Sequence, residues 1–170
     1  MAIDPFLLVM GVSGTGKSAI AAELAKALDG TLVEADALHS RENIKRMAAG
    51  LPLTDALRLP WLRAVADAAI AARGQEPVVI ACSALKRAYR EVLRSKLRSM
   101  TIVYLTGERD LIFQRMRARS SHFMPASLLD SQIADLEPPV GEREITMDVA
   151  LLREAIVEAV LKRLNTDGAG

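Results

Sequence analysis

The residues most able to do chemistry lie in one glycine-rich segment near the amino terminus. The segment reads Gly11-Val12-Ser13-Gly14-Thr15-Gly16-Lys17-Ser18 and fits the pattern G-x-x-x-x-G-K-[ST] throughout. Glycines let successive backbone N–H groups turn inward around phosphates, and a helix that begins there adds its positive dipole end. A chance match is the alternative, but this one follows an apolar run and precedes a helical pattern, as the motif requires. We therefore expect the segment to bind ATP or GTP, with Lys17 on the β- and γ-phosphates and Ser18 on Mg²⁺.

Asp36 is the acid that we expect beside those phosphates. Many P-loop ATPases carry an Asp at the end of a later strand, but no acid follows the apolar run at residues 77–82. Asp36 comes just after another candidate strand, and the carboxyl ends of parallel strands converge on the phosphate loop. It could accept a proton from a substrate hydroxyl, help to position Mg²⁺, or do both. The structural alternative is an Asp that caps a helix.

Three arginines, Arg115, Arg117 and Arg119, alternate just before a polar segment at residues 120–124 that we interpret as part of a mobile lid. Arg115 and Arg119 share one helix face because they are four residues apart. Arginines at a lid can clamp the transferred phosphoryl group and neutralise its developing charge. We expect Arg119 to act in catalysis with Lys17 and Asp36, and Arg115 to bind the nucleotide. A solvated basic helix face is the alternative.

Short apolar runs alternate with amphipathic stretches along the chain, and these elements must position the reactive groups. The expected strands are residues 6–10, 31–34, 77–82, 101–105 and 145–149. The expected helices are residues 17–28, 40–49 with Ser40 as cap, 58–73, 83–97 with Ser83 as cap, 108–119, 125–138 and 151–164. Strands separated by helices predict a parallel sheet covered on both faces, with right-handed crossovers.

This order of elements predicts a single α/β domain, a three-layer sandwich around a parallel five-stranded sheet. Within residues 1–170 we expect a helical substrate-binding insertion at about 40–73 and a helical lid at about 119–130. Closure of the lid would exclude water, so that ATP is not simply hydrolysed.

Length and composition restrict the class of protein. The chain has 170 residues, about one domain, of which 51% are hydrophobic and 25% charged. Its net charge of +1 gives no support for a nucleic-acid partner or a polybasic membrane anchor. The single cysteine, Cys82, excludes an internal disulfide. Because no apolar run is long enough for a membrane span and no secretory signal is present, we expect a cytoplasmic protein.

Several further segments carry a resemblance to the small bacterial-type gluconokinases, which belong with the shikimate and nucleoside-monophosphate kinases. The matches follow the family's order from residue 11 to about residue 139. They are the phosphate loop, Asp36-Ala37-Leu38-His39, Gly50-Leu51-Pro52-Leu53-Thr54-Asp55, Arg58-Leu59-Pro60-Trp61-Leu62, Cys82-Ser83-Ala84-Leu85-Lys86, Arg119 with His122-Phe123, Ser131-Gln132, and Leu136-Glu137-Pro138. Many families share the phosphate loop, whereas the Leu-His, Pro-Trp-Leu, Cys-Ser-Ala-Leu-Lys and His-Phe pieces are much more specific.

The resemblance implies ATP-dependent phosphorylation of D-gluconate at its 6-hydroxyl, with Mg²⁺, by a homodimeric kinase. It also implies that Asp36 meets the acceptor hydroxyl, and that Ser83 and Lys86 contact the acceptor or a phosphate. Gluconate carries a carboxylate and several hydroxyls, so its pocket needs a cation and hydrogen-bonding groups. The candidate substrate-binding residues are Asp36, His39, Arg41, Arg58, Ser83, Lys86 and His122. The sequence leaves open which cation binds the carboxylate.

Two alternative functions remain open on the sequence. One is a kinase of another small hydroxy acid, such as shikimate. The other is a nucleotide-binding interaction module without catalysis, although such a module would not need Asp36, Lys86 and the arginines together. The chain departs from the family at Leu57, where an acid is usual and could cap a helix or contact the substrate.

Overall fold

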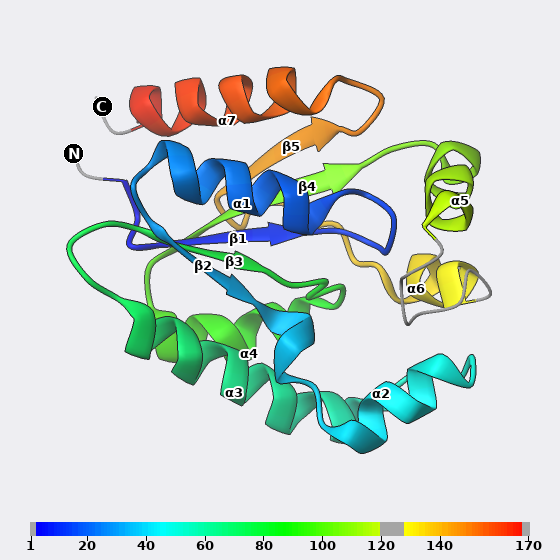
Figure 1. Cartoon of the computed structure of the whole chain (residues 1–170). Coiled ribbons are helices and arrows are strands. Elements are labelled where there is room, and N and C mark those ends of the chain that lie inside the picture. The colour runs from blue at the N-terminus through cyan, green and yellow to red at the C-terminus, as the bar shows by residue number, and fades with distance from the viewer. Residues whose placement is uncertain (1–2, 120–127, 168–170) are drawn as a thin grey trace.

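The computed structural model describes residues 3–119 and 128–167, and its centre is a parallel β-sheet (Figure 1). The strands are β1 (Phe6–Met10), β2 (Thr31–Glu34), β3 (Val78–Ala81), β4 (Met100–Thr106) and β5 (Glu144–Asp148). They pair in the order β2-β3-β1-β4-β5, and every pair is parallel. The predicted five-stranded parallel sheet is therefore confirmed.

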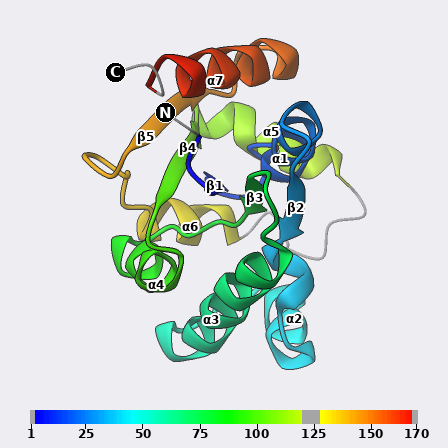
Figure 2. The same ribbon diagram turned by 90° about the vertical axis from the view of Figure 1, so that its left-hand side faces the viewer.

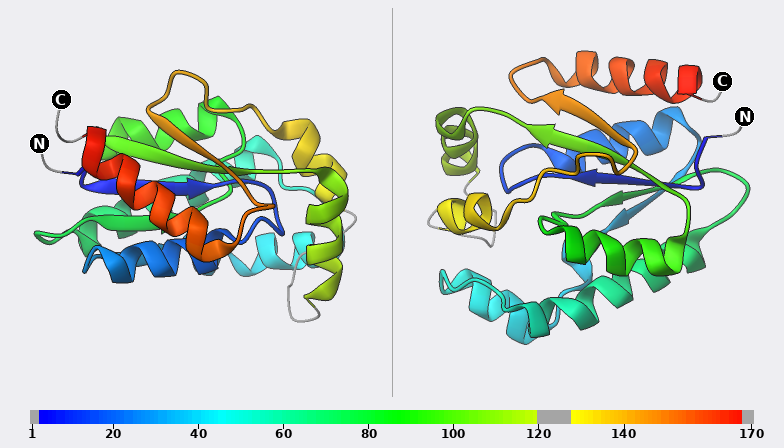
Figure 3. Two further views of the ribbon diagram at one scale, coloured as in Figure 1. Left: turned by 90° about the horizontal axis from the view of Figure 1, so that it is seen from above. Right: turned by 180° about the vertical axis from the view of Figure 1, so that it is seen from behind.

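Helices cover both faces of the sheet. They are α1 (Lys17–Ala27), the 3₁₀ helix η1 (Ala35–Leu38), α2 (Arg41–Ala48), α3 (Asp55–Ala72), α4 (Arg87–Leu97), α5 (Arg109–Ala118), α6 (Leu129–Asp135) and α7 (Arg153–Asp167). Figure 2 shows α1 and α7 on one side of the sheet and α3 and α4 on the other. Helices α2, α5 and α6 gather at the end towards which the strands point (Figure 3). The predicted three-layer sandwich is confirmed.

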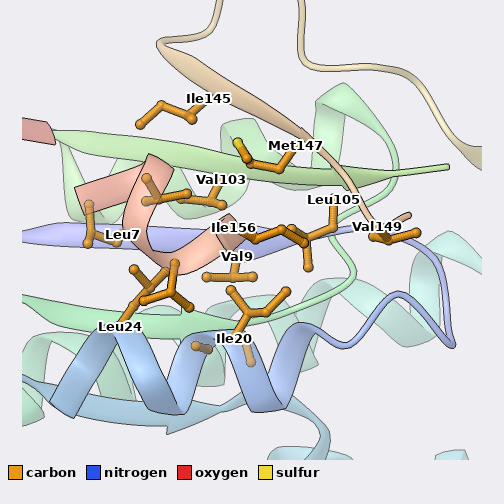
Figure 4. Close-up of a cluster of buried hydrophobic side chains, with 14 of the residues drawn as sticks. Leu7, Val9, Ile20, Leu24, Val103, Leu105, Ile145, Met147, Val149 and Ile156 are labelled. Atoms are coloured by element: carbon orange, nitrogen blue, oxygen red, sulfur yellow. The ribbon is translucent and has the colours of Figure 1, made fainter. Parts of the chain in front are cut away.

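The alternation of side chains along β1 divides the core between the two helical layers. Leu7 and Val9 pack with Leu24 of α1 and Ile156 of α7 (Figure 4). Phe6, Leu8 and Met10 belong to the cluster that α3 and α4 complete. All of β1 is buried, as expected for a strand covered on both faces.

The starts of α3, α4 and α6 differ most from the sequence prediction. Helix α6 is Leu129–Asp135, shorter than the helix predicted over residues 125–138, of which residues 125–127 lie outside the described part of the chain. Helix α3 begins at Asp55 rather than residue 58, because Thr54 is its cap and its hydroxyl accepts a hydrogen bond from the Leu57 N–H at 3.3 Å. Helix α4 begins at Arg87, so the prediction of Ser83 as a cap is wrong. The Arg87 N–H instead donates to the Glu137 carboxylate at 2.7 Å, and residues 83–86 form a loop. The predicted Ser40 cap is confirmed by a 3.1 Å bond from the Asn43 N–H.

The strand register brings three loops to one edge of the sheet. Val9 of β1 and Glu34 of β2 both lie opposite Ala81 of β3. The segments that follow these strands, residues 11–18, 35–39 and 82–86, therefore begin side by side. Ligands of open parallel sheets bind at this edge. No helix in the described ranges is both long and apolar enough to cross a bilayer.

Candidate functional site

The phosphate loop leaves β1 and enters α1 in a backbone conformation that needs glycine. Gly14 and Gly16 have φ angles of 84° and 86°. At Gly14 a Cβ would also lie 2.6 Å from Cγ of Met116 and 2.9 Å from the Ile112 carbonyl oxygen. Helix α5 therefore packs directly on the loop. The Thr15 hydroxyl closes the loop by donating to the Val12 carbonyl at 2.8 Å.

Lys17 folds back over the loop that precedes it. Its ammonium donates to the Val12 carbonyl oxygen at 3.0 Å, and its side chain is half-buried. Burial lowers the pKa of Lys17 below its ordinary value, although the nearby Asp36 carboxylate opposes this effect. The position is the one expected of a lysine that reaches bound phosphates.

Ser18 offers a fitting place for Mg²⁺ together with Glu34. The Ser18 hydroxyl donates to Oε2 of Glu34 at 3.0 Å, at the exposed start of α1. Hydroxyl and carboxylate oxygens are ligands that Mg²⁺ accepts, alongside phosphate oxygens and water. The described residues form no group of three or more His, Cys, Asp and Glu that could hold a metal by themselves. Sequence analysis missed Glu34, although its place at the end of β2 is a usable signal.

An inner cavity lies between the phosphate loop and helices α2, α3 and α6. Its lining is Ser13, Lys17, Asp36, His39, Met47, Pro52, Leu53, Arg58, Trp61, Ser83, Leu128, Ser131 and Gln132. Four of the candidate substrate-binding residues therefore lie around one cavity, and Lys17 lies in its wall beside them.

His39 is a neutral imidazole in the wall of the inner cavity. Its ring stacks on Trp61 with 4.1 Å between ring centroids, and the Trp61 N–H donates to the Ala35 carbonyl at 2.7 Å. Burial lowers the pKa of His39 to about 4, against the opposing charge of Asp36, whose Oδ1 lies 3.8 Å from Nε2. The other nitrogen, Nδ1, is buried and has no hydrogen-bond partner within the described residues.

Arg58 is the arginine in the wall of the inner cavity. Only 8% of the residue is exposed, and its Nε donates to the Leu53 carbonyl at 3.3 Å. Its guanidinium carbon lies 5.4 Å from the centre of the Tyr89 ring. Nη2 is 4.0 Å from Oδ2 of Asp135. Arg58 is thus a positioned cation with N–H groups left for a ligand.

Two other candidate substrate-binding residues, Arg41 and Lys86, do not line the inner cavity. Arg41 is exposed on α2. Lys86 lies near the cavity, with its ammonium 3.3 Å from Oδ1 of Asp55 and 3.8 Å from Oδ1 of Asp135. His122 falls outside the described residues, as does most of the predicted lid. Leu57 faces a separate groove between α2 and α3, so the departure at this position lies away from the inner cavity.

An outer cavity lies on the other side of the phosphate loop, between α1, α5 and the start of α7. Its lining is Gly14, Thr15, Gly16, Ala19, Ile20, Arg115, Arg119, Val149, Ala150, Leu151, Leu152, Arg153, Glu154 and Ile156. Arg115 is anchored there by a 2.7 Å bond from Nη1 to the Val149 carbonyl. Arg115 and Arg119 therefore line one cavity together with Gly14, Thr15 and Gly16 of the phosphate loop, and their predicted roles in nucleotide binding and catalysis stay predictions. Apolar walls next to a phosphate loop suit a nucleobase.

Gln132 of α6 lines the inner cavity and is hydrogen-bonded to Ser13 of the phosphate loop. The sequence did not predict this contact. Its Oε1 accepts from the Ser13 N–H at 2.7 Å, and its Nε2 donates to the Ser13 hydroxyl at 3.1 Å. The two residues are 119 positions apart. Their pairing is a tertiary contact, for which one sequence carries no local signal.

Comparisons with known proteins agree with this arrangement. A family model described as an AAA domain matches residues 6–139. The chain is 39% identical to the thermoresistant gluconokinase of Escherichia coli (strain K12), over 91% of this chain and 90% of that protein. It superposes on a crystal structure of a gluconokinase from Sinorhizobium meliloti 1021 with a TM-score of 0.86 and 43% identity, covering 98% and 94% of the two chains.

A more distant likeness concerns the fold alone. Shikimate kinase from Aquifex aeolicus vf5 has a TM-score of 0.64 at 16% identity, covering 97% of this chain and 99% of that one. The level of identity separates this neighbour from the gluconokinases. The phosphate loop, the two cavities beside it and these sequence matches together place the chain in the gluconokinase family of P-loop kinases.

Proposed function

We propose that this protein transfers the γ-phosphoryl group of ATP to the 6-hydroxyl of D-gluconate, giving 6-phospho-D-gluconate and ADP. The observation that carries the proposal is the inner cavity, which places a carboxylate, a cation and a neutral imidazole next to Lys17. These groups match the hydroxyls and the carboxylate of a sugar acid. Neither a shikimate kinase nor a non-catalytic module is favoured, because the relatives of high identity are gluconokinases.

Asp36 is the group that we assign to the acceptor hydroxyl. In the reaction it accepts the proton of the 6-hydroxyl while that oxygen bonds to the γ-phosphorus. The bond from the γ-phosphorus to the β–γ bridging oxygen breaks, which leaves ADP. Lys17 and Arg119 neutralise the charge that develops on the phosphoryl oxygens. Ser18 and Glu34 would hold Mg²⁺, which supplies further positive charge at the phosphates.

Each cavity then has one ligand. ATP places its phosphates on residues 11–18 and its base in the outer cavity, where Arg115 lies against the loop after β5. Gluconate lies in the inner cavity, with His39 and Ser83 available to its hydroxyls and Arg58 to its carboxylate. The helical insertion at about residues 40–73 is the acceptor-binding part of the domain, since α2 and α3 supply Met47, Arg58 and Trp61. We keep residues 119–130 as the proposed lid.

The first experiment measures ADP formation from MgATP with and without D-gluconate. A panel of shikimate, other aldonates, glucose and nucleoside monophosphates serves as the control, and phosphorus NMR of the product identifies the phosphorylated hydroxyl. Strong stimulation by gluconate and a 6-phosphate product are expected. Stimulation by another acceptor alone would contradict the assignment of gluconate, and ATP turnover that ignores every acceptor would contradict a small-molecule kinase.

We further propose that the protein works in the cytoplasm as a homodimer, which the resemblance to gluconokinases supports. Light scattering after size-exclusion chromatography tests the assembly. A mass near twice the 18.4 kDa of one chain is expected, and the mass of a single chain would contradict it. Cell fractionation tests the location.

A further inference from the structure

Two cations and two carboxylates form a cluster beside the inner cavity, which Arg58 lines. Arg58 and Lys86 supply the positive charges, and Asp55 and Asp135 supply the negative charges. This group of four is therefore neutral before any ligand is considered. An acceptor that carries a carboxylate can pair with Arg58 or Lys86 only if the aspartate that now lies beside that cation moves away.

The two acids are held very differently. Asp55 accepts hydrogen bonds from the Tyr89 hydroxyl and from the Lys86 ammonium, and these bonds lower the pKa of Asp55. Asp135 lies 4.0 Å from Nη2 of Arg58 and 3.8 Å from Nζ of Lys86, which is too far for a hydrogen bond. Its side chain makes no hydrogen bond within the described part of the chain and is 31% exposed. Asp135 is therefore the acid that can leave at the lower cost.

Arg58 is the cation best placed to receive a new partner. It lines the inner cavity, whereas Lys86 stays hydrogen-bonded to Asp55. Only Nε of Arg58 makes a hydrogen bond to the described residues, so four of its five N–H donors remain for a carboxylate. A planar guanidinium with both Nη groups available can bind a carboxylate through two parallel hydrogen bonds.

We propose that Asp135 is a specificity-determining residue, an internal competitor of the acceptor's carboxylate for Arg58. The inference rests on the proposed function, because it assigns the carboxylate of the acceptor to Arg58. Binding of a sugar acid exchanges one carboxylate for another at Arg58, and Asp135 turns outward to solvent. Asp135 thereby raises the KM for acid acceptors, and it leaves the binding of uncharged polyols unaffected.

The variant Asp135→Asn tests this exchange, because it removes the competing charge and keeps the shape of the side chain. We expect the KM for gluconate to fall about two- to fivefold, the factor that corresponds to one partly exposed ion pair. The KM for ATP and kcat should stay within about twofold of the wild type, since Asp135 touches neither the phosphate loop nor Asp36. Asp110→Asn is the matched control, because Asp110 lies at the surface of α5, pairs there with Arg109, and is outside the proposed lid.

Two further arms separate the possible outcomes. Asp135→Ser should lower the KM for gluconate as Asp135→Asn does, and inhibition by D-glucitol, which has no carboxylate, should be the same in all variants. An unchanged KM for gluconate would overturn the proposal, and a raised KM would show that Asp135 supports acceptor binding instead. If the wild type does not phosphorylate gluconate, the proposed function is contradicted, whereas the proposed exchange at Arg58 is not. The exchange at Arg58 is then tested with the acid acceptor that the panel identifies.

Discussion

Asp36 and His39 belong to the same short turn after β2, and the two side chains share one wall of the inner cavity. The imidazole is held by its stack on Trp61, and its Nε2 lies 3.8 Å from the carboxylate. At this distance the two groups make no hydrogen bond, and the Asp36 side chain is 41% exposed. The residue assigned as proton acceptor therefore lies beside a neighbour that stays uncharged, with its carboxylate not hydrogen-bonded to that imidazole.

Asp36→Asn tests the assignment of the proton acceptor. We expect kcat to fall about 10²- to 10⁴-fold, the usual contribution of general acid–base catalysis. The KM for ATP and the urea midpoint of unfolding should change little, because the amide keeps the size of the side chain. Asp110→Asn, at an exposed position on α5, is the control and should keep full activity. Retained activity in Asp36→Asn with an intact fold would remove the catalytic role.

His39 makes stability depend on pH in a defined direction. Its pKa is lowered from 6.5 to about 4 by burial, so the folded state stays neutral where the unfolded chain takes up a proton. The contribution of His39 to stability is therefore complete above about pH 6.5 and is lost as the pH falls towards 4. Urea unfolding at pH 7.5 and pH 5 measures the loss. We expect a smaller loss in His39→Gln than in the wild type, and equal losses would contradict a buried neutral imidazole.

At the scale of elements, helix α4 fixes the loop that carries Ser83 and Lys86. Arg90 is fully buried, and its Nη1 donates to the carbonyl oxygens of Ala84 and Leu85, both at 3.0 Å. Its Nε and Nη2 bind the Glu142 carboxylate at 3.0 and 2.7 Å. One guanidinium therefore holds the loop and its own counter-ion together. Arg90 is part of the scaffold and is not available to the acceptor.

Removal of the counter-ion should therefore destabilise the whole domain. In Glu142→Ala the Arg90 guanidinium keeps its bonds to the two carbonyls but is left buried without its counter-ion, and we expect a loss of about 3–5 kcal/mol in the free energy of unfolding. Urea denaturation measures it. The control is Glu91→Ala, which breaks an exposed pair with Arg87 and should cost less than about 1 kcal/mol. Equal losses in the free energy of unfolding in the two variants would mean that the buried pair contributes no more to stability than the exposed pair.

The sequence predicted those elements whose signals are local. The phosphate loop, the strand before it and the helix after it follow from one contiguous motif. The start of α4 could not be predicted in this way, because Arg87 is capped by Glu137, 50 residues further along the chain. The start of α3 did have a local signal in Thr54, which the prediction did not use.

The same distinction applies to the candidate site. Asp36, His39, Arg58 and Ser83 were predicted from short specific segments, and the structure brings them to one cavity. Gln132 and Asp135 received no role from the sequence, because their partners lie far away in the chain. A single sequence shows which residues could do chemistry, whereas the pairing of α6 with the rest of the site requires the fold.

At the scale of the whole molecule, the phosphate loop separates two cavities. Ser13 and Lys17 face the inner cavity, and residues 14–16 face the outer one. The inner cavity draws on α2, α3 and α6, and the outer cavity on α1, α5 and α7. Under the proposed function each ligand therefore meets a different set of helices, and the reacting groups meet at the loop between the two cavities.

This division gives the molecule an optical reporter for one ligand. Trp61 is the single tryptophan of the chain, and it lines the inner cavity with its ring stacked on His39. Tryptophan fluorescence therefore comes from the side of the inner cavity alone. We expect gluconate to change the emission of Trp61 in a titration, and a non-hydrolysable ATP analogue by itself to change it much less. Equal responses to both ligands would contradict this separation, and a gluconate response yields the acceptor Kd without turnover.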